Sequence, residues 1–219
     1  MGEAEIIQHT HRLFIRARFF FYGEAASRDL AIQIADDVAR HWNEPRGHAI
    51  IRGEHYEVIF ETEAMADPGL PPETVWYNTD PMNNYFRIES FSLPDISFVD
   101  GLGSNTGYFK LDNLLHNSTT AAHEFGHTLG LDHPANTDIR GKGQPAIMYP
   151  RGTICDPAFQ YDPLALPLQP GGTMNPFYRK VLASDIDSLQ LHSLRFSASR
   201  KAVLGDFSSL YHEKHLPSV

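Results

Sequence analysis

The chain has 219 residues, a length that fits a single domain. Its 42% hydrophobic and 21% charged residues are typical of a soluble globular protein and exclude wholesale disorder or a fibrous fold. The formal net charge of −9, without a run of Lys and Arg, argues against nucleic-acid binding. No segment approaches the roughly 18 consecutive apolar residues that a membrane span requires.

The sequence leaves the compartment open. Residues 1–14 lack the basic-then-apolar profile of a secretory signal, so either the protein is exported by another route or a leader has been removed. Cys155 is the only cysteine, so no intramolecular disulfide can form and the usual marker of an oxidising compartment is missing. A monomer is the default expectation.

The first half of the chain predicts strands around one helix. Residues 12–22 predict a strand, because apolar side chains from Leu13 to Phe21 alternate with arginines. Apolar residues at helical spacing predict a helix that begins after Ser27 as its cap and ends before Pro45. Strand-like runs follow at 48–53 and 55–64, and then a Pro-rich loop around 68–72.

The second half predicts strands at 86–91 and 97–111 and a helix at 117–131 with Asn, Ser and Thr available as caps. Residues 150–183 form a long loop, which in a compact domain indicates function or disorder. A last helix is predicted at 183–196, and the polar tail after Arg200 is expected to be mobile. This order of elements indicates an α+β or α/β fold.

The stretch HEFGHTLGLDH at 123–133 has the spacing of metal ligands. Each helical residue turns about 100°, so His123 and His127 project from one face toward a single ion. On a continuous helix His133 would point away, but Gly130 can adopt a positive φ, end the helix and let the chain turn back. Three imidazoles leave one coordination position free for water, which indicates a catalytic zinc rather than a structural one.

Glu124 is the candidate general base of this site. It is poorly placed to be a fourth ligand, yet it is close enough to accept a proton from water held by the zinc. Zinc lowers the pKa of bound water from about 15.7 toward about 7 and polarises a carbonyl, so the pattern predicts amide hydrolysis. HExxH alone is as compatible with a solvated helix face as with a zinc site, and the glycine and third histidine in register favour the zinc site.

The pattern HExxHxxGxxH resembles the metzincin clan of zinc endopeptidases, and HEFGHTLGLDHP is most similar to the matrixins. AIMYP at 146–150 is similar to the Met-turn of that clan, in which Met148 would form an apolar floor beneath the metal. SDIDSLQ at 184–190 is similar to the matrixin C-terminal helix that packs against this turn. These matches cover chiefly residues 116–150 and 183–195, and the first of them is the specific one.

The resemblance implies an α+β fold: a twisted, mostly parallel sheet with one antiparallel edge strand, an active-site helix and an irregular C-terminal subdomain ending in a helix. We therefore expect one catalytic domain at 1–219, with subdomains at 1–133 and 134–219. An extended substrate would add to the edge strand within 97–111, near Gly107 and Tyr108. Tyr149, Pro150 and the residues just after them would wall the pocket for the side chain that follows the cleaved bond.

The family pattern is incomplete in three respects. The segment FVDGLGSNTGYF lacks the histidines of the matrixin second-zinc segment, so we expect a single catalytic Zn²⁺ and no structural zinc, and structural calcium is not indicated. Tyr149 follows Met148 directly rather than two residues later, so it is left outside the metal shell. No pro-segment with an inhibitory cysteine is recognisable, and Cys155 is interpreted as a plain thiol.

The favoured function is zinc-dependent cleavage of a protein or peptide substrate, and the family prior is action outside the producing cell. The alternative is a zinc-bearing peptide-binding module, or a domain of a delivered toxin, that captures a peptide without turnover. Hydrolysis of a non-peptide amide is a third possibility. The loop 151–178 either shapes specificity over the cleft or is an ordered surface excursion.

Overall fold

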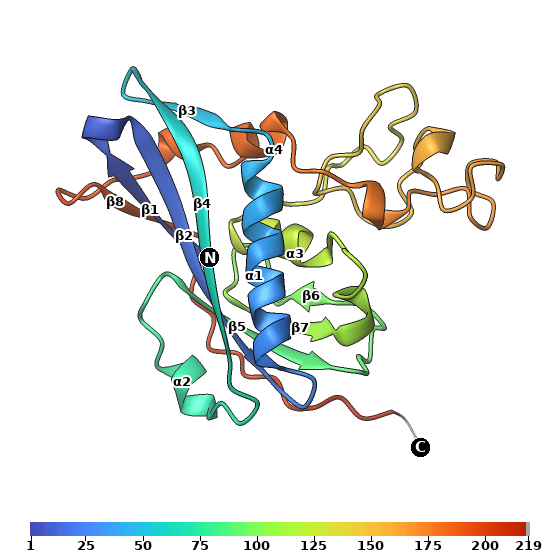
Figure 1. Ribbon diagram of the computed structural model, residues 1–219, viewed down its shortest axis with the longest axis horizontal. Helices are drawn as coiled ribbons and strands as arrows, with labels where there is room; N and C mark the ends of the chain where they lie inside the picture. The colour runs from blue at the N-terminus through green and yellow to red at the C-terminus, as the bar shows by residue number, and fades with distance from the viewer. Residues whose placement is uncertain (218–219) are drawn as a thin grey trace.

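A curled mixed sheet is the framework of the protein in a computed structural model that describes residues 1–217 (Figure 1). The main strand order is β3-β4-β2-β5-β7-β6. These strands are β3 (His48–Ile51), β4 (Glu54–Ala66), β2 (Arg12–Tyr22), β5 (Asn83–Glu89), β7 (Thr106–Lys110) and β6 (Phe98–Val99). The four central strands run parallel, and β3 and β6 pair antiparallel at the two ends. The α+β prediction is confirmed.

The alternation of apolar and charged side chains predicted for residues 12–22 is present in β2, which lies between β4 and β5 in the sheet. Its inward-facing side chains, from Leu13 to Phe21, are buried in the hydrophobic core. The arginines between them face outward and pair with glutamates at the matching register of β4, as Arg16 does with Glu61 at 2.7 Å. The strand is therefore held by apolar burial on one face and by cross-strand ion pairs on the other.

Helix α1 (Arg28–Asn43) packs on the sheet and supports the helix that carries the histidines, α3 (Thr120–Thr128) (Figure 1). It begins as predicted, because the Ser27 hydroxyl accepts a hydrogen bond from the Leu30 backbone N–H at 3.3 Å. At its other end the Trp42 indole N–H donates to the Ala122 carbonyl at 3.0 Å. The Phe125 ring meets the Trp42 ring edge-on, at a centroid distance of 5.8 Å. The two helices are thus locked together.

Two strands were not expected from the sequence, β1 (Gly2–Ile7) and β8 (Lys201–Leu204). β1 pairs antiparallel with the first half of β2, and β8 pairs with β1. The sheet therefore contains more antiparallel pairs than the single edge strand that the resemblance implies. The expectation of a mobile tail after Arg200 is wrong, since β8 begins at once and the later residues return to the sheet. There His212 Nε2 lies 2.8 Å from Asp100 and the His215 ring stacks on Tyr108 at 4.0 Å.

Most of the chain from 134 to 200 is irregular, as predicted. Its regular pieces are short: η3 (Pro157–Phe159), η4 (Pro176–Tyr178), α4 (Ala183–Ser188) and η5 (Leu191–Ser193). The helix predicted at 183–196 stops early because Gln190 takes the left-handed conformation, with φ of 47°. Cys155 is a buried thiol in a small apolar cluster with Ile139 and Met174. The long loop therefore has a core of its own.

The remaining elements are η1 (Gln8–Thr10), α2 (Pro72–Trp76) and η2 (Leu111–Asn113). Within residues 1–217, none of the helices has both the length and the apolar character needed to cross a membrane.

Candidate metal centre

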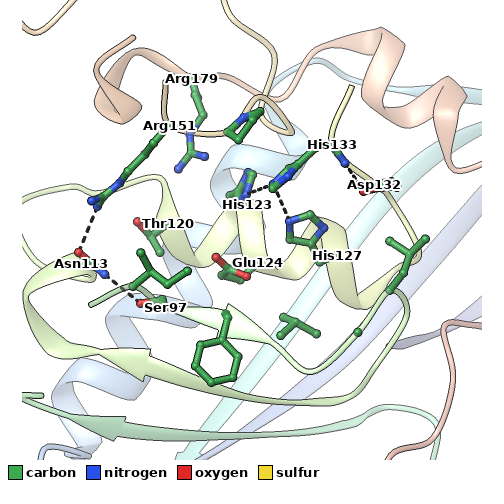
Figure 2. Close-up of a pocket in the computed structure, with 16 residues that line it drawn as sticks. Ser97, Asn113, Thr120, His123, Glu124, His127, Asp132, His133, Arg151 and Arg179 are labelled. Carbon is green, nitrogen blue, oxygen red and sulfur yellow. Dashed lines mark hydrogen bonds between the residues drawn. The ribbon is translucent and has the colours of Figure 1, made fainter. Parts of the chain in front are cut away.

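Three imidazoles converge at the C-terminal end of α3 (Figure 2). His133 Nε2 lies 3.1 Å from His123 Nε2 and 3.1 Å from His127 Nε2. Two nitrogens that each bind zinc at 2.0–2.1 Å in tetrahedral geometry would lie about 3.3 Å apart. The spacing of the three nitrogens therefore fits one ion of this size, and the predicted tripod is present.

The other ring nitrogens set which atoms are available to the metal. His123 Nδ1 lies 2.7 Å from the Ile147 carbonyl oxygen, and His127 Nδ1 lies 2.7 Å from the Leu131 carbonyl oxygen. A carbonyl oxygen only accepts, so each Nδ1 carries the proton and each Nε2 lone pair points into the shared space. Burial also lowers the pKa of both imidazoles, which favours the neutral form that binds metals.

Gly130 ends the helix in the way that the sequence predicted. Its φ is +95°, and its N–H donates to the His127 carbonyl at 3.0 Å while the Leu131 N–H donates to the Gly126 carbonyl at 3.0 Å. These two bonds form a Schellman motif, which reverses the chain after α3. The reversal carries His133 back beside the two helical histidines.

Two residues of the segment expected to cap α3, Ser118 and Thr119, hold the start of the helix in different ways. Thr119 is the N-cap residue, but its side chain makes no capping bond. Its hydroxyl instead donates to the Pro176 carbonyl at 2.7 Å and accepts from Arg179 Nε at 3.1 Å. The start of the helix is held locally by Ser118, whose Oγ accepts from the Thr120 N–H at 3.1 Å, and it is also tied to the C-terminal region through Thr119.

Met148, which the resemblance implies is an apolar floor beneath the metal, packs against the histidine helix α3. It is buried, and its sulfur packs so closely on Gly126 that a Cβ at that position would overlap it. The next residue back, Ile147, accepts the hydrogen bond from His123. Asp185 of α4 contacts the same turn: it hydrogen-bonds the Ile147 backbone, and burial raises its pKa to about 6. Ile147 therefore orients the His123 ring, and Asp185 of α4 contacts Ile147 in turn.

Glu124 is 6% exposed and faces the cleft beside the histidines (Figure 2). Burial raises the pKa of its carboxyl to about 8, and the positive charge of Arg179 opposes that rise. A carboxyl whose proton affinity is raised toward neutral pH is suited to accept and return a proton.

The histidines and Glu124 lie in a cleft of about 460 Å³. One wall is the edge strand β6 with its flanking residues, another is α3, and the third is formed by Pro150, Arg151 and Arg179. The cleft is lined by Ile96, Ser97, Phe98, Val99, Gly101, Leu102, Asn113, Thr120, His123, Glu124, His127, Asp132, His133, Pro150, Arg151 and Arg179. A bounded groove therefore runs between the sheet edge and the C-terminal region.

Of the four predicted pocket residues, one lines the cleft. Pro150 lines the cleft, whereas Gly107, Tyr108 and Tyr149 do not. Gly107 and Tyr108 belong to β7, one strand further in, and Tyr108 is fully buried. Gly107 instead allows β6 to approach, because a Cβ there would overlap the Phe98 carbonyl oxygen. The edge strand is β6, since the chain reverses between 99 and 106.

The residues that sequence reasoning missed are Thr120, Asn113 and Arg179. Arg179 lies 46 positions after His133 in an irregular loop, and no local pattern marks it. Arg151 falls in the segment just after Pro150, which was expected to wall the pocket.

No protein-family model matches the chain, and a search of curated proteins gives no match. What supports a metal site is therefore the geometry of the three histidines and their neighbours.

Proposed function

We propose that the protein is a zinc-dependent endopeptidase that hydrolyses peptide bonds of a protein or peptide substrate. The observation that carries this proposal is the convergence of three imidazole nitrogens, 3.1 Å apart in two pairs, beside a buried carboxylate in an open cleft. His123, His127 and His133 would hold the ion. Bound there, zinc would lower the pKa of water and polarise the carbonyl of the scissile bond.

Glu124 would move the protons of the reaction. Its carboxylate accepts a proton from water as the water oxygen attacks the carbonyl carbon, and it then gives that proton to the amide nitrogen as the carbon–nitrogen bond breaks. The products are a carboxylic acid and an amine. Burial of Glu124 supports this role, because a carboxylate with a raised pKa is a stronger base toward water, and its protonated form persists at neutral pH until the leaving amine takes the proton.

The edge strand β6 would hold the substrate. It pairs with β7 on one side only, and its residues Phe98 and Val99 line the cleft on the other side. An extended peptide could therefore add to the sheet here through main-chain hydrogen bonds. Because β6 has only two residues, this ladder is short, and side-chain pockets would contribute much of the selectivity.

The test is a digest of a peptide library, read by mass spectrometry, with the wild type and Glu124→Gln in parallel. The wild type should bind about one zinc per chain and cleave peptides, and a chelator should abolish cleavage. Glu124→Gln keeps the shape of the side chain but cannot take a proton, so it should retain zinc and lose activity by at least about 100-fold. Equal cleavage by the variant would refute the mechanism, and zinc binding without any cleavage would favour a peptide-binding module.

A further inference from the structure

Arg179 is a buried cation that no carboxylate of the described chain contacts directly. It is 4% exposed, and its guanidinium donates to two neutral acceptors, the Thr119 hydroxyl through Nε and the Tyr149 carbonyl through Nη1, both at 3.1 Å. Within residues 1–217 no carboxylate lies within 4.0 Å of it. A buried charge is destabilising unless an opposite charge compensates it. The two neutral acceptors orient the group and leave its charge unbalanced.

The free side of this guanidinium faces the cleft. Arg179 lines the cleft wall, and Figure 2 shows its guanidinium directed downward from the C-terminal loop between Arg151 and His123. Nη2 has no hydrogen-bond partner among the described residues. The one carboxylate whose charge acts on it is Glu124, which our proposed mechanism assigns to proton transfer. A ligand in the cleft can therefore reach Nη2 and its charge.

Two further donors lie at the same end of the cleft (Figure 2). Arg151 is exposed, and Asn113 Oδ1 orients its guanidinium by accepting from Nη2 at 3.2 Å. The Thr120 hydroxyl accepts from Ser118 at 2.8 Å, which leaves its own proton available to a ligand. The other acidic residue of the cleft, Asp132, lies on the far side of the histidines in this view. This end of the cleft therefore combines two cations and one hydroxyl.

We infer that this end of the cleft is an anion subsite that binds a substrate carboxylate, with Arg179 as its buried anchor and Arg151 at its mouth. The inference rests on the proposed endopeptidase function and names its substrate class: peptides with Asp or Glu immediately after the cleaved bond, or peptides cleaved near a free C-terminal carboxylate. A planar guanidinium matches a carboxylate through paired hydrogen bonds, and burial strengthens that contact.

The two sources of the carboxylate are separated with synthetic peptides. Once a cleaved sequence is known, the residue after the cleaved bond is varied among Glu, Gln and Leu, each with a free or an amidated C-terminus. An acidic side-chain site predicts that the Glu peptide exceeds the Gln peptide by about 10- to 100-fold in kcat/KM, with no effect of amidation. A terminal carboxylate site predicts instead that amidation causes the loss.

Arg179→Gln and Arg151→Gln test which residues carry the preference. Arg179→Gln should remove most of the Glu-over-Gln preference, measured as the ratio of kcat/KM for the two peptides, whereas Arg179→Lys should restore part of that preference. Arg151→Gln should reduce the preference by less, because Arg151 is exposed. Arg195→Gln, an exposed arginine outside the cleft, is the matched control and should leave the preference unchanged.

A structural role alone would give a different result. If Arg179 only ties Thr119 to Tyr149, Arg179→Gln lowers cleavage of the Glu and Gln peptides equally, and the inference is wrong. Zinc content and the melting temperature of each variant identify unfolded protein, and Arg151→Gln still tests the subsite if Arg179→Gln does not fold.

Binding separates the failure of this inference from failure of the proposed function. Fluorescein-labelled peptides with a central Glu or Gln in otherwise randomised positions are titrated into the Glu124→Gln protein and followed by fluorescence anisotropy. Tighter binding of the Glu pool, lost in the Glu124→Gln and Arg179→Gln double variant, supports the subsite even if the wild type cleaves nothing. The pools are prepared with free and with amidated C-termini. Equal binding of all four pools overturns the subsite, whether or not the wild type is an active peptidase.

Discussion

Gly130→Ala tests whether the end of α3 positions the third histidine. The φ of +95° at this residue is unfavourable for any side chain, and an added Cβ would meet no atom within 4 Å, so the whole cost is backbone strain. That strain is about 1–2 kcal/mol. If the chain relieves this strain by moving Leu131 and His133, zinc binding must restore the strained geometry. The affinity for zinc then falls by roughly 5- to 30-fold.

The assay is competition for zinc against a chromophoric chelator, together with thermal unfolding of the zinc-free protein. A destabilisation of this size corresponds to a fall of roughly 2–8 °C in melting temperature for a chain of this length. Gly130→Asn should recover part of the zinc affinity, because Asn tolerates left-handed backbone better than Ala does.

Gly53→Ala is the matched control. Gly53 lies in the turn between β3 and β4 with φ of +84°, and a Cβ there also meets nothing within 4 Å. The two substitutions introduce similar strain, but only one lies next to a ligand. Zinc affinity of Gly130→Ala within about twofold of the wild type would refute the reasoning, and so would an equal loss in Gly53→Ala.

Three other predictions follow from the same geometry. Zinc should raise the melting temperature of the wild type and not of His133→Ala, because the ion binds the folded state through three imidazoles; an equal rise in both, measured by calorimetry, would contradict the site. Gly126→Ala should destabilise the protein by about 1–3 kcal/mol in denaturant unfolding, because the new methyl displaces the Met148 sulfur; a change below about 0.5 kcal/mol would contradict that packing. Burial raises the pKa of the Asp185 carboxyl from its ordinary 3.8 to about 6, so the folded state binds a proton at Asp185 more tightly than the unfolded state does. The stability that this protonation contributes is therefore lost as pH rises from about 4 to 6. Relative to Asp185→Asn, the wild type should lose up to about 3 kcal/mol of unfolding free energy between pH 4 and pH 7, and a parallel pH dependence in the two proteins would contradict this cause.

Features encoded by local periodicity were predictable from the sequence. The strand at 12–22 and the helix after Ser27 follow from apolar spacing, and the structure has both within one residue of the expected bounds. The three-histidine cluster was predictable for a similar reason, since helical geometry fixes His123 and His127, and one glycine determines where His133 can lie.

Features that depend on contacts distant in sequence were not predictable. β1 and β8 are short and become strands through pairing, since β1 pairs with β2 on one side and with β8 on the other. β1 and β8 lie about 200 residues apart along the chain. The glycines at 101, 103 and 107 interrupt the strand-like stretch 97–111, but they do not show which part is the edge strand, because that depends on where the chain reverses between 99 and 106. Arg179 reaches the cleft through bonds to Thr119 and Tyr149, and neither bond has a local sequence signature.

The C-terminal segment braces the cleft from behind. His212 contacts Asp100, the residue directly after β6, and the His215 ring stacks on Tyr108 of the adjacent strand. The same segment is also tied to α3, because the Asp206 N–H donates to the Gly103 carbonyl at 2.8 Å and the Gly103 N–H donates to the His127 carbonyl at 2.8 Å. The edge of the cleft and the end of the histidine helix therefore share one support, so removing the chain from Asp206 onward would loosen both the groove and the three imidazoles.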